Sequence, residues 1–427
     1  MFHRHKSLGA ALVAVATAGS LALTHSPAEA DFSPQPKDVV STGSDIIQNS
    51  FNFLADGYHQ LPGYNTAGNR YRFVNFDSSG DAQGRSAFTD PRLLPTITGN
   101  GTVGENGVKY IKQSDVKLLN PTIALGAGQD LVVRPSGGGA GGTLALIADD
   151  EKNIDVGRSP NPLTTTNQNN AQNNLGTKLL RIQVATDRQL IAAASTTNAP
   201  ATISAGDILK IYNGQITTWG QVTGYSGPAA GETIIPLILP TDAGMWNTFV
   251  TNVDNQNPTT VTSDQLRANP NSIQVQQNDP TAITSLSPAQ RANAIVPFPR
   301  GRFRTLNTGY YTDPTTTNAY NLEPERTPIL ADGIQLLDPN STADVASATA
   351  PYGGNFAYNA LVRESDLNSN VAWQPGSTLN WVQALFYNPG GPDPFVRTPA
   401  GEALLTAAGV TPDYHVFGTD NNEIPVD

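Results

Sequence analysis

Four loops rich in glycine, serine, threonine and aspartate carry the residues whose types and spacing best suit a chemical task. They are Ser41–Asp45, Arg134–Gly142, Gly157–Pro160 and Thr241–Gly244, and each follows a short apolar stretch typical of a strand. Glycines let a backbone approach an oxyanion closely, hydroxyls add donors, and a helix N-terminus adds free N–H groups and partial positive charge. The loops therefore favour a site for a small tetrahedral anion.

Each loop also fits a purely structural interpretation. Asp45 and Asp242 suit helix N-caps, Arg158 suits a surface ion pair, and Gly137–Gly142 suits a flexible loop. The glycine run is not followed by Gly-Lys-Ser/Thr, so it is not a Walker A loop. The residues alone leave these alternatives open.

Residue types that many enzymes need are scarce in this chain. Cysteine is absent, which excludes disulfides, thiolate metal sites and cysteine nucleophiles. Only His59 and His415 lie beyond the N-terminal segment, and no Gly-x-Ser-x-Gly occurs. We therefore expect no enzyme activity, no metal and no cofactor. The net charge of −11 argues against nucleic acid as a partner, because its phosphates attract a positive surface.

The first 30 residues have the order of a secretory signal peptide. Arg4 and Lys6 form a basic start, the apolar stretch Leu8–Leu23 follows, and Ala28–Ala30 matches the small-x-small cleavage pattern. The apolar stretch is short for a membrane span, which takes about 20 residues. We therefore expect cleavage near Ala30–Asp31 and a secreted, extracellular mature protein without membrane insertion.

The loops need a scaffold, and the segments between them predict one. Short apolar strands alternate with amphipathic helices along the chain. This alternation predicts an α/β protein with mostly parallel sheets, in which strand-to-helix loops gather at the carboxyl ends of the strands. Three polar stretches, 58–66, 163–174 and 313–320, have the composition of solvated loops.

Six segments follow one another in an order and spacing that match a known family: Gly43–Gln48, Arg134–Gly137, Ile154–Ser159, Ile203–Trp219, Leu239–Gly244 and Asn293–Phe298. With these segments the chain resembles the phosphate-type solute-binding proteins of ABC transporters, in particular their secreted actinobacterial members. The resemblance covers most of residues 38–310, and the longest segment is its most specific part.

The resemblance implies a periplasmic-binding-protein-like fold of type II. In that fold two α/β domains are joined by two crossover segments and enclose a ligand cleft. The expected crossovers lie near 182–193 and 294–298. The expected division is a signal peptide at 1–30, domain 1 at 31–185, domain 2 at 186–293, and a return to domain 1 with a C-terminal extension at 294–427.

The resemblance also implies a set of ligand contacts. In this family phosphate lies in the cleft, held by backbone N–H groups and hydroxyls from four loops. Carried over by position, the implied contacts are Gly43, Ser44, Asp45, Ser136, Gly137, Gly138, Gly139, Arg158, Ser159, Thr241, Asp242, Ala243 and Gly244.

Three of these loops depart from the family pattern. Gly138 and Gly139 stand where serine is usual, Pro160 stands where Asp or Ser is often found, and Ala243-Gly244-Met245 stands where Ser-Gly-Thr is usual. We therefore keep two hypotheses. The first is a secreted, monomeric solute-binding protein for inorganic phosphate or a similar oxyanion, with an ABC permease as a candidate partner. The second is a drifted family member that acts as an extracellular binding, sensing or surface protein for a different ligand.

Overall fold

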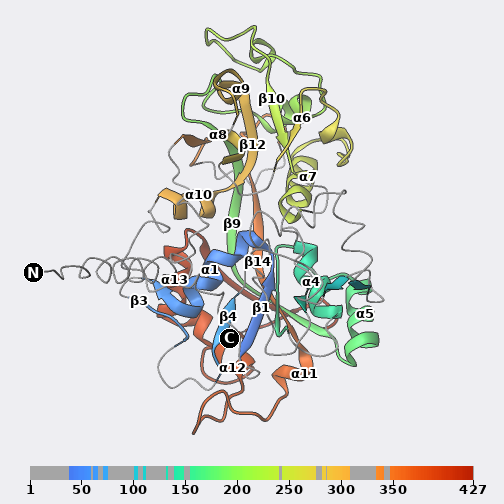
Figure 1. The fold of residues 1–427 in the computed structure, drawn as a ribbon, viewed down its shortest axis with the longest axis vertical. Coiled ribbons are helices and arrows are strands. Elements are labelled where there is room, and N and C mark those ends of the chain that lie inside the picture. The colour runs from blue at the N-terminus through green and yellow to red at the C-terminus, as the bar shows by residue number, and fades with distance from the viewer. Residues whose placement is uncertain are drawn as a thin grey trace, which may run out of the picture.

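The chain forms two lobes joined by long strands, with helices packed around a mixed sheet (Figure 1). The α/β class predicted from the sequence is therefore confirmed. The signal peptide predicted at 1–30 lies outside the described residues. The computed structural model describes residues 38–58, 61–65, 71–75, 101–103, 109–111, 131–132, 139–148, 154–239, 243–275, 281–284, 286–307, 333–340 and 347–426.

Lobe one, the lower lobe in Figure 1, is built on three parallel strands. β1 (Val39–Gly43) pairs with β4 (Phe73–Asn75) on one side and with β8 (Val156–Ser159) on the other. Helix α1 (Asp45–Asp56) follows β1 directly, and α4 (Gly139–Ala148) packs against β1 and β8. Because the strands are parallel, their carboxyl ends lie at one edge of the sheet.

Lobe two, the upper lobe in Figure 1, repeats this arrangement. β10 (Ile235–Ile238) pairs in parallel with β11 (Ile273–Gln274) and with β12 (Ala294–Pro299). Helices α6 (Ala205–Tyr212) and α7 (Gly244–Gln256) pack on each other beside these strands. Each lobe thus presents helix starts next to parallel strand ends.

Long strands join the two lobes into one sheet. β9 (Leu179–Ala194) pairs along its first part with β14 (Gly354–Arg363) and β15 (Thr411–Phe417), and along its last part with β12 and β13 (Ile334–Leu337). The strand order β11-β10-β12-β9-β14-β8-β1-β4 therefore runs unbroken from one lobe to the other. The expected crossovers at 182–193 and 294–298 fall within β9 and β12.

The remaining elements are mostly short and surround this frame. The strands are β2 (Gly57–Tyr58), β3 (Leu61–Pro62), β5 (Gly101–Val103), β6 (Lys109–Ile111), β7 (Leu131–Val132) and β16 (Glu423–Ile424). The helices are α5 (Thr165–Leu175), α8 (Thr281–Thr284), α9 (Pro288–Asn293), α10 (Arg300–Asn307), α11 (Glu364–Leu367), α12 (Trp381–Leu385) and α13 (Pro399–Ala407). Single 3-10 turns occur at Trp219–Gln221, Gln265–Arg267 and Phe395–Arg397.

The prediction of a loop at 163–174 is wrong, because α5 occupies this stretch. Thr164 begins the helix with a capping box, in which its hydroxyl accepts a bond from Asn167 N at 3.1 Å. Gly176 ends it in the left-handed conformation with φ of 69°. Caps at both ends thus stabilise a helix whose polar Thr/Asn/Gln composition carries little apolar periodicity.

The stretch 58–66 is only partly the solvated loop that its composition predicted. Its start pairs in the small sheet of β2 and β3, and Tyr64 is buried. The Tyr64 ring stacks on Trp373 with 5.1 Å between ring centroids, which ties this stretch to the C-terminal part of lobe one. The third predicted loop, 313–320, lies outside the described residues.

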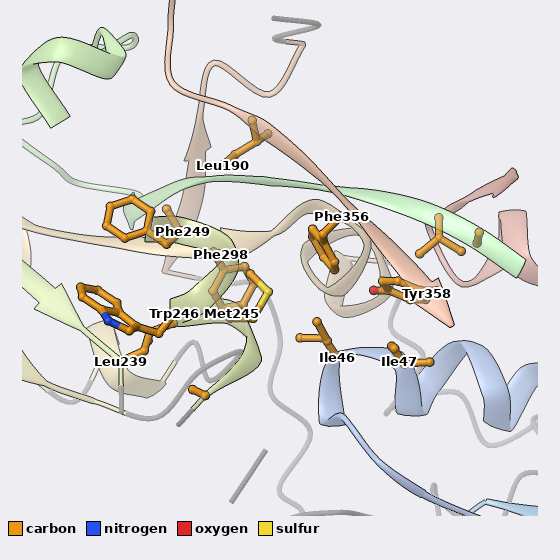
Figure 2. Packing of buried hydrophobic residues seen from close by; sticks show 14 of the residues in the cluster. Ile46, Ile47, Leu190, Leu239, Met245, Trp246, Phe249, Phe298, Phe356 and Tyr358 are labelled. Carbon is orange, nitrogen blue, oxygen red and sulfur yellow. The ribbon is translucent and has the colours of Figure 1, made fainter. Parts of the chain in front are cut away.

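One hydrophobic core extends through both lobes. Figure 2 shows part of it, with Met245 and Phe249 from α7 on one side and Ile46 from α1 and Phe356 from β14 on the other. The apolar core is therefore continuous from one lobe to the other. No helix within the described stretches is long and apolar enough to cross a membrane.

Candidate functional site

Strands β1 and β8 end side by side at the edge of lobe one that faces lobe two (Figure 1). Gly43 pairs with Arg158, and Ser44 N donates to Arg158 O at 3.1 Å. Helix α1 begins directly after β1, and α4 begins at Gly139 against the same strand ends. The first turn of a helix has N–H groups without intrahelical partners and a partial positive charge. Two such helix starts meet at this edge.

Three glycines allow α4 to sit directly on the strand ends. A Cβ on Gly43 would lie 2.6 Å from the Cα of Gly142 and 2.5 Å from Arg158 O, and one on Gly157 would lie 2.7 Å from Gly142 O. Gly43 also has φ of +120°, which residues with side chains rarely adopt. A side chain at any of these glycines would push α4 away, so glycine determines how closely the helix starts approach.

Arg158 is completely buried and holds the first loop through its carbonyl groups. Nε donates to Ser44 O at 3.0 Å, Nη2 donates to Gly43 O at 3.1 Å, and Nη1 donates to Asn75 Oδ1. Nη1 also reaches Ser41 O at 3.4 Å. The interpretation of Arg158 as a surface ion pair is therefore wrong. Its guanidinium fixes the loop and places a full positive charge beneath the strand ends.

Helices α1 and α7, which begin in this region, have no side-chain cap, and the same is true of α11. The N-cap of α1 is Ser44 rather than Asp45 as predicted, and its side chain makes no capping bond. Ser44 Oγ is buried and has no partner among the described residues, an arrangement that costs about 1–3 kcal/mol. By contrast, α5, α6, α9, α12 and α13 start at side chains that accept a first-turn N–H: Thr164, Ser204, Ser287, Asn380 and Thr398.

Helix α7 brings a third helix start to the same region, from lobe two. It contacts α4 and β14, and its N-cap Ala243 has no side chain that could cap it. Gly244 and Met245 form its first turn, and both are buried. Where a hydroxyl donor was expected from the family pattern, this turn presents the thioether of Met245 to the shared core (Figure 2).

The third loop is described in full and makes its own local contacts. Ser159 Oγ accepts a bond from Asn161 N at 3.1 Å and lies 3.2 Å from Asn161 O. Its hydroxyl therefore stabilises the turn after β8. Within the described part of the chain, no group of three or more His, Asp or Glu side chains is arranged to hold a metal ion.

The structure gathers part of the predicted contact set and leaves the rest undescribed. Asp45 and Gly139 are described by their backbone, as the first residues of α1 and α4. Gly43, Ser44, Arg158 and Ser159 meet at the strand ends, while Ala243 and Gly244 begin α7. Outside the described residues lie Ser136, Gly137, Gly138, Thr241 and Asp242.

Sequence reasoning missed two residues that organise this edge, Asn75 and Gly142. Asn75 ends β4 and accepts from Arg158, while its amide donates to Gln48 O at 2.8 Å and to Asn52 Oδ1 at 2.5 Å. A single asparagine after a short strand gives no signal of such a role. Gly142 belonged to the predicted glycine loop, but it lies in the first turns of α4, where its closeness to β1 and β8 is a property of the fold.

Comparison with known proteins assigns the chain to a family. The model of a PBP superfamily domain matches residues 117–330, half of the 427-residue chain. A search of curated proteins finds no match.

Several solved structures are similar to the chain at low identity. An ABC-type phosphate transport receptor from Vibrio cholerae is 16% identical, with 65% of this chain and 85% of that chain covered and a TM-score of 0.35. A putative phosphate ABC transporter substrate-binding protein with bound phosphate from Clostridium perfringens is 13% identical, with 65% of this chain and 84% of that chain covered and a TM-score of 0.37. The periplasmic phosphate-binding protein PfluDING, bound with phosphate, is 14% identical, with 88% of this chain and 90% of that chain covered and a TM-score of 0.42. On the family match over half its length, the chain belongs to the PBP superfamily, a family of binding proteins rather than enzymes.

Proposed function

We propose that this protein binds phosphate or a similar tetrahedral oxyanion between its two lobes, as a secreted solute-binding protein. The observation that supports this proposal most is the uncapped start of α1, where Ser44 keeps a buried hydroxyl without a partner among the described residues. An anion at this point would accept bonds from Ser44 Oγ and from first-turn N–H groups. It would thereby act as the missing cap of α1.

The local electrostatics favour an anion despite the net charge of −11. The starts of α1 and α4 meet at the strand ends, and α7 contacts α4 from lobe two. The buried guanidinium of Arg158 lies next to the start of α1, with its Nε 3.0 Å from Ser44 O. Charges and dipoles act strongly over a few ångströms in a buried site, whereas distant surface carboxylates are screened by salt.

Calorimetric titration of the mature chain with phosphate and with sulfate tests the proposal. We expect one phosphate per chain. Ser44→Ala should weaken phosphate binding roughly 10- to 100-fold, because a hydrogen bond to a charged partner contributes about 1.5–3 kcal/mol. Ser41→Ala is the matched control, since Ser41 also has a buried hydroxyl without a described partner but lies within β1. Absence of binding heat with every oxyanion tested would refute the proposal.

A second candidate ligand is an organophosphate, which fits the hypothesis of a drifted family member. Met245 favours it, because the first turn of α7 offers a buried thioether where a hydroxyl donor is usual. An apolar group next to the phosphate could pack on this side chain. Titration with butyl phosphate separates the two candidates. Tighter binding than inorganic phosphate in the wild type, reversed by Met245→Thr, would favour the organophosphate.

We also propose that the protein reaches this role outside the cytoplasm, after removal of residues 1–30. The basic–apolar–Ala-x-Ala order supports cleavage before Asp31. We keep the division into 31–185, 186–293 and 294–427, a monomeric state and an ABC permease as candidate partner. N-terminal sequencing of exported protein and sedimentation of the purified chain test the cleavage site and the monomer. Mature protein that begins with Met1 would contradict the export proposal.

A further inference from the structure

We infer that Gln189 is a positioning residue, which holds the first turn of α7 against the long strand β9 and thereby sets the affinity of the anion site. The ligand part of this inference rests on the proposed function. The anchoring part does not, because it concerns how α7 is held before any ligand binds. Lobe two contributes the start of α7 to the proposed site. A residue that fixes the first turn of α7 therefore also fixes the backbone N–H groups that this turn would offer to an anion.

Both ends of the Gln189 amide are occupied by hydrogen bonds in a fully buried setting. Nε2 donates to Met245 O at 2.8 Å, in the first turn of α7, and lies 3.9 Å from Met245 Sδ. Oε1 accepts from Tyr352 Oη at 2.5 Å and from Asn252 Nδ2 at 3.5 Å. The tyrosine hydroxyl thus orients the amide, and the amide nitrogen is left to hold the α7 carbonyl.

Gln189 lies where β9 passes from one lobe to the other. In register it stands beside Pro299 at the end of β12 and beside Gly354 at the start of β14. Gly354 has no side chain, and a Cβ there would overlap the Asn252 amide of α7. The helix is therefore pressed onto the joining strands at two levels, by its first turn through Gln189 and farther along through Asn252.

A polar group at this place is informative because its surroundings are apolar. Met245, Phe249 and Tyr352 are all buried there, and the Phe249 and Tyr352 rings meet edge to face at 5.4 Å. An apolar residue of the same size would fill the space but would leave Tyr352 Oη and the Met245 carbonyl without this partner. Hydrogen bonds have fixed directions, whereas apolar contacts allow sliding, so a buried amide fixes the position of the helix.

The test compares Gln189→Met with Gln183→Met. Both variants remove a glutamine from β9, but Gln183 bonds Asp413 in lobe one, at 2.8 Å, and pairs in register with Asn359 of β14 and His415 of β15. Hydrogen exchange of the backbone amides of residues 243–249 is measured first, without ligand. Phosphate affinity is then measured by calorimetry at a temperature where each variant is folded.

For Gln189→Met we expect faster hydrogen exchange in the first turn of α7 and roughly tenfold weaker phosphate binding. For Gln183→Met we expect neither change. A variant that loses only thermal stability, with unchanged exchange in residues 243–249 and unchanged phosphate affinity, overturns it. If wild-type protein binds no phosphate, the proposed function fails, and the exchange comparison alone decides whether Gln189 anchors α7. Tyr352→Phe, which removes only the hydroxyl that orients the amide, provides a milder variant with the same expected direction if Gln189→Met does not fold.

Discussion

Asp187 is a buried carboxylate at the junction of the lobes, and its ionisation should make the protein less stable as pH rises. It lies on β9 and is 1% exposed. Gly301 N, at the start of α10, donates to Oδ1 at 2.9 Å and to Oδ2 at 3.0 Å, while Tyr358 Oη from β14 donates to Oδ2 at 3.2 Å. Arg188 N donates to Oδ1 at 2.7 Å. Strands β9 and β14 and the start of α10 therefore meet at one carboxyl group.

Burial raises the pKa of Asp187 to about 7, although the hydrogen bonds from Arg188 N and Gly301 N and the charge of Arg300 lower it. Because the folded pKa lies above the ordinary 3.8, folding binds a proton between these two values. The stability from this group is fully present below pH 3.8 and is lost as pH rises through about 7. At 1.36 kcal/mol per pKa unit, the loss between pH 5 and pH 8 is roughly 2.5 kcal/mol.

Equilibrium unfolding in urea at pH 5 and at pH 8 measures this loss. We expect the difference in stability between Asp187→Asn and wild type to shift by roughly 2.5 kcal/mol in favour of the variant over this range, because asparagine does not titrate. Any cost of pairing the asparagine amide less well than the carboxyl group is the same at both pH values and cancels when the two differences are compared. Asp254→Asn, which alters a carboxylate that accepts from Val261 N, controls for substitution effects unrelated to the junction. Equal pH dependence in wild type and Asp187→Asn would show that the Asp187 carboxyl does not carry this loss of stability.

Two further predictions concern other parts of the fold. The hydrogen bond to Glu423 raises the pKa of His415, so His415→Gln should lose stability at pH 6 and lose none at pH 9, by less than about 1 kcal/mol given its exposure, as measured by urea unfolding. Gly142→Ala should lower the melting temperature and weaken phosphate binding, because a Cβ would lie 2.9 Å from Arg158 N and displace α4; Gly231→Ala, where a Cβ meets no atom within 4 Å, should leave both unchanged.

Much of lobe one followed from local patterns, whereas the joining strands did not. Local patterns indicate a strand end or a helix start at three places: the Ser-Asp loop, the glycine run and the Gly-Arg-Ser turn. Parallel pairing of β1 with β8 brings the first and the last of these together. The role of Gln189 depends on Tyr352, 163 positions away, and no local pattern records such a pairing. The same holds for α5, where a capping box and a final glycine outweigh a composition typical of loops.

The place of β14 between β8 and β9 constrains the order in which this chain can fold. Arg363 of β14 bonds Asp155, 208 positions earlier, so the central sheet stays incomplete until most of the polypeptide is available. Such distant pairings require the closure of large loops, and they slow folding relative to local structure. Until β14 arrives, β8 and β9 each present an unpaired edge, which invites association with other chains. We therefore expect a slow, late folding step that completes both lobes together.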